Sequence, residues 1–328
     1  MVNFCQFGAG RIGQIHAANL NANARASLRY VVDVHEPAAK QLTEQFGGTV
    51  SDTGTALADP ELDAVVIASS TDTHADLMER AAKAGKAIFC EKPIDLDMKR
   101  VEACLKTVAD AGVPLMIGFN RRFDPNFLAL KAGVRAGRVG TVELLNITSR
   151  DPAPPPIEYI KVSGGLFRDM MIHDLDLARW FLGEEPVEVF ASASCLVDPK
   201  IGDAGDIDTA VVTLKTGSGK LCQIGNSRRA VYGYDQRIEI FGSAGMLQAG
   251  NRMPTTVVHS GPDGVTGDKP YHFFLERYPE AYRSELDHFI DCVEKGVAPE
   301  PSGADGRAAL ALADAAQQSF DSGRPVSL

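Results

Sequence analysis

The chain contains 328 residues, of which 45% are hydrophobic, 23% charged and 7% aromatic, the composition of an ordinary globular protein long enough for two domains with sizeable cores. Its formal net charge of −10 argues against nucleic-acid binding, which draws on Lys and Arg to displace counterions from phosphates, and it disfavours anionic membranes. No signal sequence or apolar run of about 18 residues is present, and the six cysteines form no CxxC pair, so we expect a cytoplasmic protein with reduced thiols, no membrane partner and no metal site.

The first 120 residues alternate short β-branched runs with amphipathic segments. The runs predict strands at Val2–Phe7, Leu28–Val34, Ala64–Ala68, Ala87–Cys90 and Leu115–Ile117. Helices are expected between them, at Arg11–Asn21, through Lys40 and Gln45, and at about 75–84 and 97–111. Strands that are apolar on both faces and alternate with helices are typical of a parallel sheet covered on both sides. The sequence therefore predicts a doubly wound α/β domain at 1–120.

The pattern changes after Arg121, where the strands become longer and alternate between apolar and polar residues. We expect these strands at Val142–Thr148, Val187–Val197, Thr209–Lys215, Lys220–Gly225 and Arg237–Phe241. Long helices are expected at about 166–182 and 304–320, and a proline-rich loop at Asp151–Pro156. Alternating strands separated by turns favour an open, mostly antiparallel sheet with one face free. The second domain is therefore predicted as an α/β domain at 121–328, with a C-terminal helix that could pack back on the first domain.

A glycine-rich segment leaves the first predicted strand and opens the first helix. Gly8, Gly10 and Gly13 form a G-x-G-x-x-G pattern, in which the glycines allow a tight turn, close approach of a pyrophosphate and close packing of helix on strand. Asp33 lies 20 residues past Gly13, where an acid binds the ribose hydroxyls of NAD and repels the 2′-phosphate of NADP. The pattern favours NAD, although Arg11 could still meet a phosphate, and the alternative is an ordinary glycine turn with a surface aspartate.

Polar residues follow two other predicted strands, at 69–74 (SSTDTH) and at Glu91-Lys92-Pro93. Ligands of open parallel sheets bind beyond the carboxyl ends of the strands. Lys92 precedes a proline and should be extended, so we expect its side chain to leave the strand end toward a nicotinamide. A solvated surface lysine is the alternative.

The helix expected at 166–182 supplies an acid and a base. Asp169 and His173 are spaced i and i+4 and so share one helix face. Oxidation of an alcohol needs a base that titrates near neutrality, a role that suits histidine, while a cation such as Lys92 can stabilise a developing alkoxide. In the alternative interpretation Asp169 only complements the helix dipole and His173 is a surface imidazole.

Several of these motifs occur together in one known family. GAGRIG at 8–13, Glu91-Lys92-Pro93, GFNRRFD at 118–124 and the glycine, aspartate and histidine pattern of 164–174 resemble the glucose-fructose oxidoreductase/inositol dehydrogenase/rhizopine-catabolism (Gfo/Idh/MocA) family over essentially the whole chain. Within it, SRDP at 149–152 and FLERY at 274–278 are similar to the myo-inositol 2-dehydrogenase branch. Some inositol dehydrogenases carry a His and an Asn near the positions of Arg150 and Asp151, so the preferred isomer is left open.

The resemblance implies a Rossmann domain for NAD and a second domain whose open sheet face builds dimers or tetramers. It assigns catalysis to Lys92, Asp169 and His173. The expected cofactor contacts are Gly8, Gly10, Arg11, Ile12, Gly13, Asp33, Ser69, Ser70, Thr71, His74, Glu91, Lys92 and Asn120. The expected substrate contacts are Lys92, Asn120, Arg121, Asp151, Asp169, His173 and Tyr282.

The resulting hypothesis is reversible oxidation of myo-inositol, or a closely related cyclic polyol, to the 2-keto inositol with reduction of NAD. One alternative keeps the chemistry but changes the substrate to another sugar or sugar acid. A second is a non-catalytic NAD(H)-binding regulator, which would have no need of a proton acceptor. A third is an enzyme that holds NAD tightly and recycles its hydride.

Overall fold

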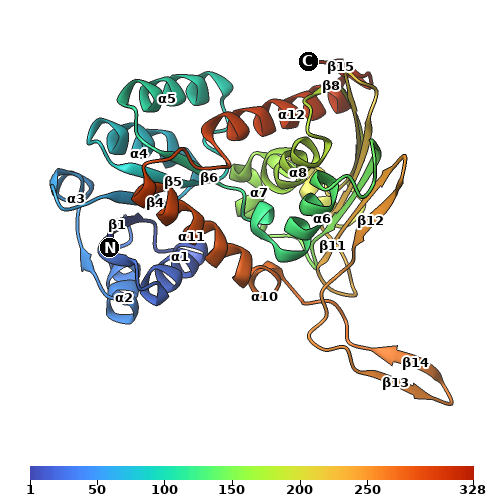
Figure 1. The fold of residues 1–328 in the computed structure, drawn as a ribbon, viewed down its shortest axis with the longest axis horizontal. Coiled ribbons are helices and arrows are strands. Elements are labelled where there is room, and N and C mark those ends of the chain that lie inside the picture. The colour runs from blue at the N-terminus through green and yellow to red at the C-terminus, as the bar shows by residue number, and fades with distance from the viewer. The chain divides into compact units, whose positions relative to one another are not determined.

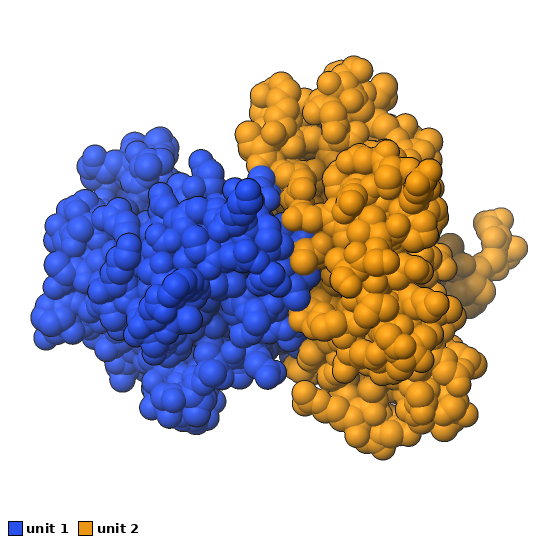
Figure 2. All heavy atoms as spheres, turned by 90° about the horizontal axis from the view of Figure 1, so that it is seen from above, with its two compact units in different colours: residues 1–123, 280–310 blue, residues 124–279, 311–328 orange.

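The computed structural model describes residues 1–328 as two compact units, coloured separately in Figure 2. Unit 1 contains Met1–Phe123 and Glu280–Leu310, and unit 2 contains Asp124–Pro279 and Ala311–Leu328. The chain therefore leaves unit 1 after Phe123 and returns to it for a late segment. How the functions divide between 1–120 and 121–328 stays a prediction.

Unit 1 is built on a six-stranded sheet in which every neighbouring pair is parallel. Its strands, in order across the sheet, are β3 (Thr49–Val50), β2 (Ala26–Val32), β1 (Val2–Phe7), β4 (Ala64–Ile67), β5 (Ala87–Glu91) and β6 (Leu115–Gly118). All residues of β4, β5 and β6 are buried, as expected for strands covered on both faces. The predicted doubly wound α/β fold is confirmed for this unit.

Helices of unit 1 include one that comes from far along the chain (Figure 1). They are α1 (Arg11–Ala22), α2 (Glu36–Phe46), α3 (Thr53–Ala58), α4 (Thr71–Lys83), α5 (Met98–Ala111) and α11 (Pro279–Lys295). In α11, Leu286, Phe289 and Ile290 recur at helical spacing and belong to the core cluster of the sheet. The Phe289 ring lies 6.2 Å from that of Phe4 and 5.8 Å from that of Phe89. This helix was not among the elements predicted from the sequence.

Unit 2 is built on a seven-stranded mixed sheet (Figure 1). Across the sheet the order is β12 (Gly245–Ala249), β11 (Asp235–Gly242), β7 (Val142–Arg150), β10 (Leu221–Ser227), β9 (Thr209–Thr216), β8 (Pro186–Ser194) and β15 (Val326–Ser327). Only β7 and β10 are parallel, and the other neighbours are antiparallel. The predicted open, mostly antiparallel sheet is confirmed. Exposed apolar residues such as Val211, Leu221 and Phe241 alternate with buried ones along its strands.

Shorter elements complete the chain. They are the 3-10 turn η1 (Asn120–Phe123), helices α6 (Pro125–Arg135), α7 (Ile157–Ser163), α9 (Pro199–Asp203), α10 (Phe274–Arg277) and α12 (Gly303–Ser322), and a hairpin of β13 (Val258–Gly261) and β14 (Gly264–Gly267). The hairpin projects from the rest of unit 2 (Figure 1). All six cysteines are free. None of the helices combines the length and the apolar character that crossing a bilayer requires.

The segment that carries Asp169 and His173 differs from the prediction. One regular α-helix was expected over 166–182, but the structure has a π-helical turn, η2 (Phe167–Met171), followed by α8 (Ile172–Leu182). A π turn winds each residue through a smaller angle than an α-helix does, because its hydrogen bonds reach one residue further. The prediction of a continuous α-helix was therefore wrong in its first turn, and the face shared by Asp169 and His173 cannot be deduced from α-helical spacing alone.

A buried ion pair fixes the start of α6 in unit 2. Asp124 caps this helix by accepting hydrogen bonds from the backbone N–H groups of Asn126 and Phe127. The same carboxylate pairs with the guanidinium of Arg277, which is 2% exposed. The Arg277 guanidinium also lies 4.7 Å from the Tyr278 ring centroid and 5.7 Å from that of Phe127. The FDP and ERY segments of the sequence thus meet in one polar cluster.

Candidate active site

The glycine-rich loop follows β1 and needs glycine at its first and third positions for its own packing. Gly8 has a φ of +99°, and a Cβ there would lie 2.4 Å from the carbonyl oxygen of Ala68. A Cβ on Gly13 would lie 2.2 Å from the carbonyl oxygen of Gly8. At Gly10, in contrast, a Cβ would meet nothing within 4 Å. The chain itself leaves that position open, which fits a loop whose second glycine lets a pyrophosphate approach.

Gln6, a buried residue of β1, forms hydrogen bonds with the backbone of this loop. Its side-chain amide donates to the carbonyl oxygens of Gly8 at 2.9 Å and of Gly13 at 2.8 Å. Gln6 was not among the predicted site residues, although a glutamine between Cys5 and Phe7 in a predicted strand is a signal that could have indicated it. The contact fixes the loop to the first turn of α1 before any cofactor binds.

Asp33 lies directly after β2 and next to the loop. One of its carboxylate oxygens accepts from the backbone N–H of Ala9 at 2.6 Å, and the other accepts from that of His35 at 2.7 Å. The Asp33 side chain is therefore fixed at the carboxyl end of β2, where an acid can accept from ribose hydroxyls. The open Gly10 and the carboxylate of Asp33 fit NAD. Their contacts with it stay predictions.

The segment after β4 is joined to the end of β5 through His74. The ring of His74 is 1% exposed, with Nδ1 at 2.8 Å from the carbonyl oxygen of Pro93 and Nε2 at 3.1 Å from that of Ser69. Burial lowers the pKa of His74, which keeps the ring neutral, so one nitrogen donates at a time. Ser69 Oγ and Thr73 Oγ1 lie 2.6 Å apart. Cofactor contacts by Ser69, Ser70, Thr71 and His74 stay predictions.

Glu91 ends β5. The next residue, Lys92, is joined to Pro93 by a cis peptide bond. Asn120 and Arg121 follow β6 in η1, and both are buried. Because β1, β2, β4, β5 and β6 are parallel, their carboxyl ends meet at one edge of the sheet. The structure therefore brings every predicted cofactor residue to that edge of unit 1. Tyr282, a predicted substrate contact on α11, is buried with its ring edge-on to that of His16 at 5.9 Å.

The predicted acid and base lie in unit 2. The carboxylate of Asp169 accepts from the Tyr159 hydroxyl at 2.8 Å and lies 3.7 Å from the guanidinium of Arg228. Arg228 is 1% exposed and was missed by the sequence analysis, since an arginine beside a predicted strand gave no sign of burial. His173 is half-buried in the first turn of α8. The joint action of Lys92, Asp169 and His173 stays a prediction.

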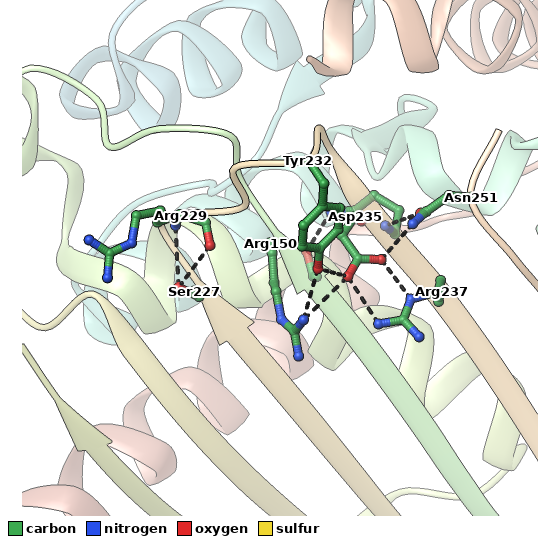
Figure 3. Close-up of polar contacts among 9 residues, drawn as sticks. Arg150, Ser227, Arg229, Tyr232, Asp235, Arg237 and Asn251 are labelled. Carbon is green, nitrogen blue, oxygen red and sulfur yellow. Dashed lines mark hydrogen bonds and ion pairs between the residues drawn. The ribbon is translucent and has the colours of Figure 1, made fainter. Parts of the chain in front are cut away.

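Asp151 follows β7 and continues its pairing with β10, because its backbone N–H donates to the Ser227 carbonyl at 2.9 Å. The preceding Arg150 points into a polar cluster at the end of the sheet (Figure 3). There it donates to the Tyr232 hydroxyl at 2.9 Å, and that hydroxyl donates to Asp235 at 2.5 Å. Arg237 donates to the same carboxylate at 2.7 and 3.0 Å. Arg150 is thus part of this cluster, while the substrate contact of Asp151 stays a prediction.

Comparisons with known proteins agree with this arrangement. The oxidoreductase family with an NAD-binding Rossmann fold matches residues 2–119, and the GFO/IDH/MocA C-terminal domain matches residues 127–248. The inositol 2-dehydrogenase of Rhizobium meliloti is 54% identical over 327 residues, which cover 100% of this chain and 99% of the relative.

Solved structures give the same result. A putative myo-inositol dehydrogenase of Sinorhizobium meliloti superposes with a TM-score of 0.98 at 54% identity, covering 100% of this chain and 99% of the other. The myo-inositol dehydrogenase of Lactobacillus casei, solved with NAD(H) and myo-inositol, has a TM-score of 0.90 at 25% identity and covers 100% and 97% of the two chains. The chain belongs to the GFO/IDH/MocA family of oxidoreductases, and its N-terminal domain is an NAD-binding Rossmann fold.

Proposed function

We propose that this enzyme oxidises myo-inositol, or a closely related cyclic polyol, to the 2-keto inositol with NAD as hydride acceptor. The observation that carries the proposal is the 54% identity, over the full chain, to an inositol 2-dehydrogenase. The polar carboxyl edge of the unit 1 sheet and the acid and base of η2 and α8 supply residue types that suit this chemistry.

In this proposal the chain's own residues handle the proton while the bound NAD supplies the hydride acceptor. His173 takes the proton of the reacting hydroxyl, because an imidazole can accept a proton near neutral pH. Lys92 donates to the reacting oxygen and stabilises the charge that develops on it. Asp169, held by the Tyr159 hydroxyl and lying beside Arg228, supports the lysine and histidine electrostatically.

Substrate selection is assigned to Asn120, Arg121, Asp151 and Tyr282. These side chains offer amide, guanidinium, carboxylate and phenol groups, which suit a ring of hydroxyls. A site built to hydrogen-bond each hydroxyl rejects an analogue that lacks one by a factor of about 10⁴–10⁵, because its own buried polar groups are then left unpaired. We therefore expect sharp discrimination against deoxy-inositols.

The proposal is tested by following NADH absorbance with a panel of inositol isomers, aldoses and sugar acids, run in parallel with NAD and NADP. Myo-inositol with NAD should give the highest kcat/KM. His173→Ala should reduce kcat by about 10²–10⁴, the usual contribution of a general base, while NAD affinity persists. His259→Ala, in the exposed hairpin strand β13, is the matched control and should turn over normally.

Other outcomes of the same panel support the alternatives. A sugar or sugar acid as best substrate would make this a related dehydrogenase of the family. Near-normal turnover by His173→Ala would refute the assigned base. Tight NADH binding without turnover of any polyol would support a non-catalytic regulator, and NAD that co-purifies with the protein would support internal recycling of hydride.

The open sheet of unit 2 also supports a homo-oligomer, either a dimer or a tetramer. We place this assembly in the cytoplasm. Phe241, Leu221 and Val211 are 45%, 48% and 44% exposed, and exposed apolar side chains gathered on one face often mark an interface. The six free cysteines suit a reducing compartment. Light scattering of Phe241→Glu against the unaltered chain tests the assembly, and an unchanged mass would place the interface elsewhere.

A further inference from the structure

Three ionisable side chains from distant parts of the sequence meet inside unit 1. They are His16 of α1, Glu91 at the end of β5 and Glu285 of α11, and their exposed fractions are 0%, 9% and 0%. One nitrogen or oxygen atom from each lies within 4.8 Å of the others. The proposed mechanism uses none of these side chains as an acid, a base or a substrate contact.

The first two residues form a well-defined pair. His16 Nε2 lies 2.7 Å from Glu91 Oε1, a hydrogen-bonding distance. The neighbouring strand β6 leaves room for this carboxylate, because a Cβ on Gly118 would lie only 3.0 Å from Glu91 Oε2. The rings of Phe89 and Tyr282 flank the His16 ring, with centroids 5.0 and 5.9 Å away. The Glu91 carboxylate is therefore confined by packing as well as by its hydrogen bond.

Glu285 is the unusual member of the group. It is fully buried, and neither of its carboxyl oxygens has a hydrogen-bond partner within the protein. An ionised carboxylate in such a place would lose several kcal/mol of solvation without compensation. Burial raises the pKa of Glu285 well above its ordinary value, and the nearby charge of Glu91 raises it further. Both effects favour the protonated acid at neutral pH.

A metal ion is the other way to balance two buried carboxylates, but the geometry argues against it. Zinc ligands at about 2.0–2.1 Å from a tetrahedral ion are about 3.3 Å from one another. The 2.7 Å between His16 Nε2 and Glu91 Oε1 is too short for two ligands of one such ion and suits a shared hydrogen. Protonation of a side chain, and not a metal ion, therefore balances the charge of the two buried carboxyl groups.

We propose that Glu285 is a neutral carboxylic acid facing the carboxylate of Glu91, and that the buried group of His16, Glu91 and Glu285 is a positioning device for Lys92. Glu91 is bonded directly to Lys92 along the chain, so fixing its side chain fixes the strand end from which the lysine departs. The inference rests on the proposed role of Lys92. It adds that a residue of α11, almost 200 positions away in sequence, sets the geometry of that lysine without touching substrate.

Infrared spectroscopy tests the protonation state directly and requires no substrate. At neutral pH the unaltered enzyme should show the C=O stretch of a protonated carboxylic acid, and this band should shift in D₂O and disappear in Glu285→Gln. The absence of such a band from the unaltered protein would overturn the proposal. So would a stoichiometric metal ion, found by elemental analysis of the purified enzyme and lost in Glu285→Gln.

Kinetics test the positioning role. Glu285→Ala should lower kcat by about 10- to 100-fold, the loss expected when a reacting group is displaced by about 1 Å, while KM for the polyol and Kd for NAD change by less than about threefold. Glu285→Gln keeps a neutral polar group of the same size and should restore kcat to within about threefold. Leu286→Ala is the matched control, since it opens a cavity on the buried face of the same helix and should lower stability without lowering kcat.

Each outcome has a distinct meaning. Glu285→Gln as impaired as Glu285→Ala would show that the ionised form is needed and would overturn the neutral acid. Normal kcat in Glu285→Ala, or an equal loss of kcat in Leu286→Ala, would overturn the positioning role while leaving the proposed function intact. If the unaltered enzyme turns over no polyol, the proposed function fails and takes the positioning role with it, and the infrared band still decides the state of Glu285.

Discussion

Asp33→Asn removes the charge at the end of β2, while asparagine keeps the shape of the side chain. The two oxygens of Asp33 now accept from the backbone N–H groups of Ala9 and His35 at 2.6 and 2.7 Å. An asparagine can accept through its single oxygen only, so its NH₂ group must face one of these donors. The variant should therefore loosen the glycine-rich loop as well as lose the charge offered to the ribose.

The size of the effect follows from the kinds of hydrogen bond exchanged. A bond to a charged group contributes about 1.5–3 kcal/mol and a neutral bond about 0.5–1.5 kcal/mol. Replacing a charged acceptor of a ribose hydroxyl by a neutral one should therefore cost about 1–1.5 kcal/mol. Since each 1.4 kcal/mol is a factor of ten in Kd, NAD should bind about 5- to 10-fold more weakly.

The same substitution should affect NADP differently from NAD. A carboxylate at Asp33 repels a 2′-phosphate, and the amide does not, so the loss of NAD affinity should not extend to NADP. The ratio of the two dissociation constants should move toward NADP by about tenfold or more. Titration calorimetry or quenching of protein fluorescence with both cofactors measures this ratio.

Asp63 provides the matched control for this experiment. Its carboxylate also accepts from a backbone N–H, that of Asn3 at 2.8 Å, but at the amino end of β1, away from the carboxyl edge. Asp63→Asn removes the same charge from the same unit and should leave both cofactor affinities unchanged. An unchanged preference in Asp33→Asn, or an equal change in Asp63→Asn, would refute the assignment of Asp33 to the ribose.

Three further predictions concern the loop and unit 2. Gly13→Ala should abolish NAD binding and lower stability, because its Cβ would lie 2.2 Å from the Gly8 carbonyl oxygen. Gly10→Ala has open space in the chain, so it should keep its melting temperature while losing NAD affinity. Calorimetry that finds equal stability losses in the two variants would contradict this. Asp124→Ala should cost about 3–5 kcal/mol of unfolding free energy, measured in urea, because it leaves the guanidinium of Arg277 buried without its charge partner. Adding Arg277→Met should recover part of that loss. No recovery would show that the helix cap made by Asp124 contributes more stability than its ion pair with Arg277. Burial raises the pKa of Asp235, but hydrogen bonds from Arg237, Tyr232 and Asn251 outweigh it and hold the pKa below its ordinary value. The stability that Asp235 contributes is therefore present above the pKa of this residue in the unfolded chain and is lost as the pH falls through its pKa in the folded protein. Asp235→Asn should be less stable than the unaltered protein at neutral pH and should lose less stability on acidification. Parallel profiles of unfolding free energy against pH for the two proteins would contradict this.

Much of unit 1 could be predicted from local sequence because its signals are local. A strand, a G-x-G-x-x-G turn and a helix follow one another within the first 22 residues, and the parallel sheet then brings the other strand ends, such as Glu91 and Lys92, to the same edge. The helix α11 had a local signal too, in the spacing of Leu286, Phe289 and Ile290. Nothing in that spacing, however, indicates that the helix returns to the first unit, because this depends on contacts between residues far apart in the sequence, such as Phe89 and Phe289.

Other features had no local signal that could reveal them. Glu285 looks like any charged residue of an amphipathic helix, and only the fold shows that it faces Glu91 inside the protein. The π-helical turn at 167–171 depends on a shift of backbone hydrogen bonds, which side-chain spacing does not record. Asp169 and His173 could therefore be predicted from the sequence, whereas the backbone that presents them could not.

The buried polar residues of unit 1 share a geometry that suggests why they are there. Gln6 joins the Gly8 turn to the start of α1, His74 of α4 lies at hydrogen-bonding distance from the carbonyl oxygens of Pro93 and Ser69, and His16 joins α1 to the end of β5. Each side chain is fully or almost fully buried and spans two neighbouring segments at the carboxyl edge of the sheet. Polar groups of this kind add little net stability compared with apolar packing, but their directional bonds fix the distances between strand ends. An edge fixed before the cofactor arrives loses less entropy on binding and holds its reacting groups more closely in place. This accounts for the buried polar residues at this edge of the sheet.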